Sequence, residues 1–116
     1  MKNANHFIEV HNGSENFYRH QLSGLVFTDG VKALAEQCQA YWLIDLICSH
    51  QLHAAVRRQP FQVWDLQRKE TDSFSIRCTD GNFNHITSQD IPFSDFPFDL
   101  ATVWLVEGTL LLPSEY

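Results

Sequence analysis

Apolar residues recur at helical spacing from Val31 to Leu52, and this stretch is the most strongly patterned part of the chain. The residues that share one helical face are three, four or seven positions apart: Val31, Leu34, Cys38, Tyr41, Cys48 and Leu52. A second apolar face begins after Gln39 and comprises Ala40, Leu43, Ile44 and Ile47. The pattern predicts one helix, amphipathic at first and then buried on both sides, with residues 37–39 as the place for a bend.

The segment before this helix contains two signals for a helix start. Thr28 or Asp29 can accept hydrogen bonds from the first backbone amides of the long helix. Further upstream, Ser14 can cap a short helix of about two turns over residues 17–21. Residues 1–12 are expected to form either a frayed terminus or an edge strand.

After Pro60 the apolar period changes from helical to two, which is typical of strands. The predicted strands lie within residues 61–66, 73–78, 83–89 and 102–112. The first of them is apolar on both faces, so we expect it inside a sheet. Turns are predicted at Asp80-Gly81-Asn82 and Glu107-Gly108, where the backbone can adopt positive φ.

The order of helices first and strands later predicts an α+β fold, with N-terminal helices packed on one face of a C-terminal antiparallel sheet of four or five strands. The chain has 116 residues, which is enough for one hydrophobic core, so residues 1–116 are expected to form a single domain. Nine Phe, three Trp and three Tyr indicate a core built on aromatic rings.

The net charge of −6 arises in the last third of the chain, because residues 80–116 hold no Lys or Arg. The acidic residues of this segment are Asp80, Asp90, Asp95, Asp99, Glu107 and Glu115. A nucleic acid would be repelled by this third, so direct nucleic-acid binding is not expected. The acids are interpreted as a solvated face, or as a site for a basic partner.

Cysteine usage and hydropathy indicate a cytoplasmic protein. Three cysteines, an odd number, with no apolar leader after Met1 favour free thiols in a reducing compartment. The apolar run from Ala40 to Cys48 is too short to cross a bilayer and contains a carboxylate, so no membrane span is expected.

Several short motifs resemble those of a family of small uncharacterised bacterial proteins, also carried by plasmids and phages: YWLIDLI, FQVW, DGN, SDFPFD and GTLLLPSEY. The resemblance runs from about Phe17 to Tyr116. It implies a domain spanning the whole chain, and it implies no activity and no catalytic residues.

Asp45 is the candidate perturbed acid, because it lies between Ile44 and Leu46 on a helix expected to be covered on both sides. A buried carboxylate must find donors or stay protonated. The first interpretation is a structural role in which Arg19, Arg57 or a nearby amide satisfies the carboxylate. The alternatives are a general acid or base with a raised pKa, or partial exposure at a groove or dimer contact.

Histidines and cysteines provide weaker candidates. His50 and His53 lie on one helical face with Cys48 nearby, but no further metal ligand is evident, so neither a metal nor a cofactor is predicted. Cys78 and His85 share a sheet face if the intervening turn has two residues, and could then form a thiolate–imidazolium pair. With a three-residue loop they lie on opposite faces, and Ile86 joins the apolar side instead.

The segment from Ile91 to Leu100 contains two prolines and three phenylalanines and cannot be a regular central strand. It is either a loop held to the core by its rings or an exposed interaction surface with an acidic rim: Phe93, Asp95, Phe96, Phe98 and Asp99.

These observations favour a non-enzymatic binding domain whose partner is another protein or a second copy in a homodimer. The first alternative is a small enzyme that uses Asp45 with His50, His53 or His85. The second is an acidic decoy that occupies a nucleic-acid-binding protein and needs its acids on one surface: Asp90, Asp95, Asp99, Glu107 and Glu115.

Overall fold

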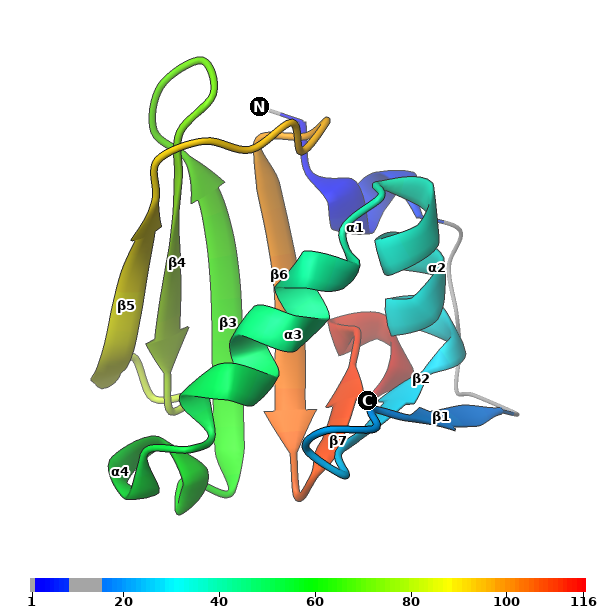
Figure 1. Cartoon of the computed structure of the whole chain (residues 1–116), viewed down its shortest axis with the longest axis vertical. Helices are drawn as coiled ribbons and strands as arrows, with labels where there is room; N and C mark the ends of the chain where they lie inside the picture. Colours follow the sequence, from blue (N-terminus) through cyan, green and yellow to red (C-terminus); the bar gives the residue numbers. More distant parts are fainter. Residues whose placement is uncertain (1, 9–15) are drawn as a thin grey trace.

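The computed structural model describes residues 2–8 and 16–116. The helices are α1 (Ala4–Phe7), α2 (Asp29–Gln37), α3 (Tyr41–His50), α4 (Ala54–Arg57) and the 3-10 helix η1 (Pro113–Glu115). The strands are β1 (Phe17–Arg19), β2 (Val26–Thr28), β3 (Phe61–Arg68), β4 (Phe74–Thr79), β5 (His85–Ile91), β6 (Leu100–Val106) and β7 (Thr109–Leu111). Figure 1 shows α3 crossing one face of the sheet, with α2 beside it.

The described strands form one seven-stranded mixed sheet in the order β1-β2-β7-β6-β3-β4-β5. Neighbouring strands are antiparallel except β2 and β7, which run parallel. The prediction of an antiparallel sheet with four or five strands is therefore wrong in strand number and in direction. The α+β class holds, but the sheet also takes two strands from the part of the chain that precedes α2.

These two strands escaped prediction because each has only three residues. A period of two cannot be recognised over so short a stretch, and pairing with β7 gives β2 its extended shape. The short helix predicted over residues 17–21 is wrong, because Phe17–Arg19 is β1 and pairs with β2. Ser14, its expected cap, lies outside the described residues.

The predicted long helix is divided in two at the expected place. Thr28 is the cap of α2, as predicted, and its side chain accepts a hydrogen bond from the Val31 amide at 3.3 Å. Gln39 adopts a φ of 51°, and the Ala40 amide donates to the Ala35 carbonyl at 2.7 Å. A residue with positive φ cannot continue an α-helix, so α3 starts in a new direction.

Near the start of the chain, α1 lies against the edge of β6 that β7 is too short to cover. The Asn5 side chain donates to the Thr102 carbonyl at 2.8 Å and accepts from the Thr102 amide at 2.7 Å. It thereby substitutes for a neighbouring strand. The described part of residues 1–12 contains this short helix, capped by Asn3, whereas residues 9–12 lie outside the described residues.

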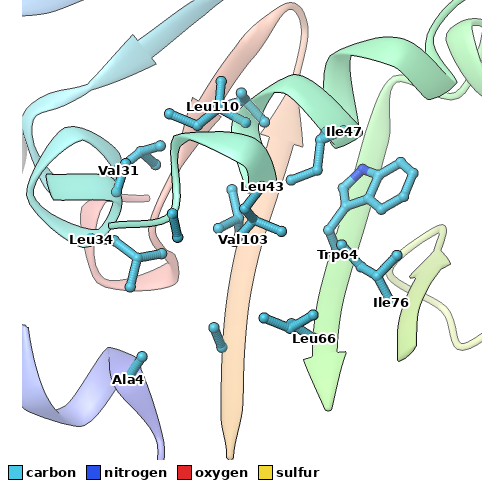
Figure 2. Packing of buried hydrophobic residues seen from close by; sticks show 14 of the residues in the cluster. Ala4, Val31, Leu34, Leu43, Ile47, Trp64, Leu66, Ile76, Val103 and Leu110 are labelled. Carbon is cyan, nitrogen blue, oxygen red and sulfur yellow. The ribbon is translucent and has the colours of Figure 1, made fainter. Parts of the chain in front are cut away.

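The core lies between α2, α3 and the face of the sheet that we call the inner face. Figure 2 shows Leu43 and Ile47 pointing from α3 toward the strands that carry Val103 and Trp64. As predicted, β3 is an internal strand, and it lies between β6 and β4. The outer face, formed by the alternate residues of the same strands, is half-buried.

Both predicted hairpin turns are present. At the turn between β6 and β7, Glu107 and Gly108 have φ angles of 49° and 86°. Between β4 and β5 the loop covers residues 80–84 and is longer than either alternative considered from the sequence. Asp80 organises it by accepting from the backbone amides of Asn82 and Asn84.

Candidate functional site

Asp45 lies on the solvent side of α3, and its side chain is 69% exposed. The expectation of a buried carboxylate is therefore not met, because the turn of α3 that carries Asp45 packs on the sheet through Leu43, Ile44 and Ile47. The partner of Asp45 is His20, not Arg19 or Arg57. His20 Nε2 lies 2.8 Å from Asp45 Oδ1.

His20 also contacts Ser23 through its other ring nitrogen. The Ser23 backbone amide donates to His20 Nδ1 at 3.2 Å, and Ser23 Oγ lies 2.8 Å from the same nitrogen. Because a backbone amide can only donate, Nδ1 is the acceptor, and the ring proton of the neutral imidazole is on Nε2, facing Asp45. The Ser23 hydroxyl then donates to Nδ1, which gives a continuous Ser23–His20–Asp45 chain.

A tight turn between β1 and β2 positions His20 and Ser23. The His20 amide donates to the Leu25 carbonyl at 2.7 Å, and the Gly24 amide donates to the His20 carbonyl at 2.8 Å. Gly24 adopts a φ of 76°, which a glycine reaches without strain. Sequence reasoning missed His20 because this segment was assigned to a helix. The sequence signal that could have identified His20 is a histidine three residues before Ser23-Gly24, a pair typical of a turn.

The Ser23–His20–Asp45 chain lines a hollow of about 360 Å³, which we call the His20 cleft. Its other lining residues are Leu22, Cys48, Ser49 and Leu52. Leu22 is 96% exposed and Leu52 is 81% exposed, so the hollow has apolar side chains open to solvent at its edges. A neighbouring hollow of about 440 Å³ shares Leu22, Ser23, Cys48 and Leu52 with it.

The three cysteines are buried thiols. Burial raises the pKa of Cys38 to about 11 and, with smaller contributions from Asp65 and Asp80, that of Cys78 to about 12. Burial also raises the pKa of Cys48, and the neighbouring Ser23 side chain has a smaller effect in the opposite direction. At neutral pH all three are therefore protonated thiols and poor nucleophiles.

The candidate pair Cys78 and His85 lies on opposite faces of the sheet. Cys78 pairs with Thr87 and Thr79 pairs with His85, so Ile86 is the extra residue of a β-bulge. Directly opposite residues share a face, which places His85 on the outer side and Cys78 in the core. Ile86 packs against the core.

His50 and His53 have ring centroids 6.5 Å apart, and His50 Nε2 lies 2.8 Å from Gln89 Oε1. His50 thus connects α3 to β5. Within residues 2–8 and 16–116, no three His, Cys, Asp or Glu side chains are grouped as metal ligands. The histidine that pairs with Asp45 is His20, and not one of those considered from the sequence, His50, His53 or His85.

A second candidate site lies on the outer face of the sheet. The rings of Phe61, Trp104 and Tyr116 contact one another, with centroid distances of 5.1, 5.5 and 5.7 Å. Val63 pairs with Trp104 across the strands, and Phe83 lines the same hollow as Val63. We call these five residues the outer aromatic patch. Phe83 is 90% exposed and Tyr116 is 72% exposed, so the patch is open to solvent.

The profile of the family of unknown function DUF6876 matches residues 2–116. The chain belongs to this family. Comparisons with curated proteins and with solved structures returned no match. Membership of DUF6876 agrees with the expectation of an uncharacterised family that spans nearly the whole chain, and it supplies no activity, so the function must be argued from the geometry.

In this DUF6876 member the predicted interaction surface on residues 91–100 is divided between core and solvent. Phe96 is 1% exposed and packs edge-on against Trp42 and Phe74. Asp99 pairs with Arg68 at 2.9 Å, and the Lys2 amide and Arg68 lower its pKa. Phe93 is 73% exposed. Most of this loop is therefore held to the core by its rings.

The acids required for a decoy lie on different elements of the fold. Asp99 precedes β6 and Glu107 follows it, so they lie at opposite ends of a seven-residue strand. Glu115 accepts hydrogen bonds from the Thr28 hydroxyl and from the amides of Gly30 and Leu112.

In the described part of the chain, each helix is too short or too polar to cross a membrane.

Proposed function

We propose that this protein is a binding domain that recognises another protein, or a second copy of itself, through the outer aromatic patch. The supporting observation is the mutual contact of Phe61, Trp104 and Tyr116 on a sheet face that α2 and α3 do not cover. Trp and Tyr are the residues most enriched at energetic hot spots of protein interfaces.

The composition of the patch supports protein binding over a merely solvated surface. Its rings form a contiguous apolar area, and exposed areas of this kind mark interaction sites. Charged groups lie at the margin, where Asp65 and Arg77 are directly opposed on neighbouring strands. An apolar centre with a polar rim is the usual anatomy of a protein interface.

The cellular compartment and the origin of this protein are also part of the proposal. Three free, buried thiols support a reducing compartment, and we therefore place the protein in the cytoplasm. A bacterial origin, on a plasmid or in a phage-derived region, stays a prediction from the motif resemblance.

Two exposed phenylalanines at opposite ends of the sheet provide a matched test. Phe83 belongs to the patch, whereas Phe93 lies in the loop after β5. Phe83→Asn suits the φ of 66° at this position, because Asn tolerates positive φ, and Phe93→Asn removes another exposed ring elsewhere. Both variants should keep the fold, which circular dichroism checks.

Sedimentation velocity over a concentration series measures self-association of the wild type and both variants. We expect Phe83→Asn to weaken association about tenfold, and Phe93→Asn to leave it unchanged. If the wild type stays monomeric, the same three proteins serve as bait, and a partner should be retained by the wild type and Phe93→Asn and lost with Phe83→Asn. Equal behaviour of the two variants, or loss with Phe93→Asn, would rule out the patch.

A further inference from the structure

We propose that Ser23, His20 and Asp45 form a hydrolytic triad, with Ser23 as the nucleophile toward carboxylic esters that carry a short apolar acyl chain. The activity is separate from the proposed binding function, because the His20 cleft and the outer aromatic patch share no residue.

The hydrogen bonds of the cleft assign one role to each residue. Ser23 Oγ donates to His20 Nδ1 at 2.8 Å, and His20 Nε2 donates to Asp45 Oδ1 at 2.8 Å. This is the order of nucleophile, base and orienting carboxylate that activates a serine in unrelated folds. The two imidazole nitrogens are exchanged relative to the chymotrypsin arrangement. The exchange keeps the chemistry, because either nitrogen can accept the proton while the other donates.

The tautomer required for a general base is set by the backbone. The Ser23 amide donates to His20 Nδ1, so this nitrogen carries a lone pair that faces the hydroxyl. Asp45 comes from α3, 25 residues further along the chain, and holds the Nε2 proton. An imidazole fixed in this way has its basic nitrogen directed at an exposed serine hydroxyl.

The reaction conserves atoms and charge. Ser23 Oγ forms a bond to the acyl carbon while its proton passes to His20 Nδ1, and Asp45 stabilises the imidazolium. The bond from the acyl carbon to the alcohol oxygen then breaks, and the leaving alkoxide takes the proton from His20. A water molecule, deprotonated by His20, attacks the acyl-serine, and cleavage of the ester releases the carboxylic acid and restores the Ser23 hydroxyl.

Protonation of His20 also exposes an oxyanion donor. Once Nδ1 carries a proton it can no longer accept from the Ser23 amide, so that amide becomes available to the negative oxygen of the tetrahedral intermediate. The amide of the nucleophile itself serves this purpose in serine proteases. The wall beside Ser23 is formed by Leu22, Cys48 and Leu52, which suits an apolar acyl chain.

A purely structural role accounts for the contacts within the turn, where the Ser23 amide donates to His20 Nδ1 and the Leu25 amide donates to Ser23 Oγ, but it accounts less well for Asp45. The turn is already closed by two backbone hydrogen bonds, from His20 to Leu25 and from Gly24 to His20. The His20 side chain is 14% exposed but that of Asp45 is 69% exposed, and a contact with a carboxylate that faces solvent contributes little to stability. Neither observation requires a carboxylate opposite His20.

The test uses the full chain and two probes, a fluorophosphonate that labels activated serines and p-nitrophenyl butyrate as ester. Ser88 is an exposed serine on β5, outside the His20 cleft, so Ser88→Ala is the matched control for Ser23→Ala. We expect mass spectrometry to locate the label on Ser23. Hydrolysis should fall about 1000-fold in Ser23→Ala and stay unchanged in Ser88→Ala.

Asp45 is a positioning residue, because it acts through His20. Asp45→Asn should lower kcat about 100-fold and leave KM unchanged, and Asp45→Glu should recover part of kcat. Unfolding curves of all variants exclude loss of fold. No labelling of the folded wild type, labelling that persists in Ser23→Ala, or equal rates in Ser23→Ala and Ser88→Ala would each overturn the triad. Phe83→Asn should hydrolyse the ester like the wild type, so the result is independent of the binding proposal.

Discussion

The carboxylate of Glu115 accepts a hydrogen bond from the Thr28 hydroxyl at 2.7 Å, which joins the end of the chain to the start of α2. The other carboxylate oxygen accepts from the Gly30 amide at 3.1 Å. An anion at a helix N-terminus satisfies amides that lack an intrahelical partner and interacts favourably with the helix dipole. Two segments 87 residues apart are thereby held together.

Position 30 has no room for a side chain, because the Glu115 carboxylate lies over Gly30. A Cβ at position 30 would lie 2.5 Å from Glu115 Oε1, so Gly30→Ala must displace the carboxylate. We expect Gly30→Ala and Glu115→Ala each to lower the free energy of unfolding by about 1–2 kcal/mol in urea titrations. In the Glu115→Ala background the clash is absent, and Gly30→Ala should stabilise α2 by up to about 1 kcal/mol. Additive effects of the two substitutions would contradict this arrangement.

The buried amide of Gln62 is a second testable feature. Gln62 is 1% exposed, exchanges two hydrogen bonds with Gln51 at 2.9 and 3.0 Å, and accepts from the Trp64 indole at 3.0 Å. Gln62→Leu would leave the Trp64 and Gln51 donors without this acceptor. We expect a loss of about 2–4 kcal/mol in the free energy of unfolding. The control is Gln67→Leu on the same strand, where the side chain is exposed, and a loss there of similar size would refute the explanation.

Acid should weaken the attachment of the N-terminal segment to the sheet. The Lys2 amide and the Arg68 guanidinium lower the pKa of Asp99 below its ordinary value. A carboxylate with a depressed pKa in the folded state stabilises the fold above its unfolded pKa of about 4, and this contribution disappears as the pH falls through the folded pKa. Asp99→Asn should therefore lose less stability between pH 5 and pH 2 than the wild type, which thermal melts at a series of pH values measure. The control Asp95→Asn should retain the acid sensitivity of the wild type.

The cysteines provide a fourth prediction. Since burial raises the pKa of Cys78 to about 12 and that of Cys38 to about 11, neither thiol should react with Ellman's reagent in the folded state at pH 8. The half-time of reaction should shorten by about 1000-fold or more in denaturant, in line with the small unfolded fraction of a typical domain. The side chain of Cys78 is 0% exposed, so rapid labelling of Cys78 in the native protein would show that β4 is less protected than this burial implies.

The local chemistry of the chain was sufficient to predict the longer elements. Eight-residue β3 and the hairpin at Glu107-Gly108 follow from a period of two and from residues that accept positive φ. The cap at Thr28 follows from a side-chain oxygen placed before a helix. In each case the signal lies within a few neighbouring residues, so no long-range contact is needed to recognise it.

The tertiary structure decided what depends on residues distant in the sequence. The three-residue β2 becomes a strand because β7 offers it a partner, and the β-bulge at Ile86 sets the face of His85. Asp45 meets His20 because the turn before β2 and the exposed side of α3 converge, although both residues are ordinary in their local sequence. Helical and strand periods encode which side of an element is apolar, whereas only the packing of those elements determines which polar side chains come within hydrogen-bonding distance.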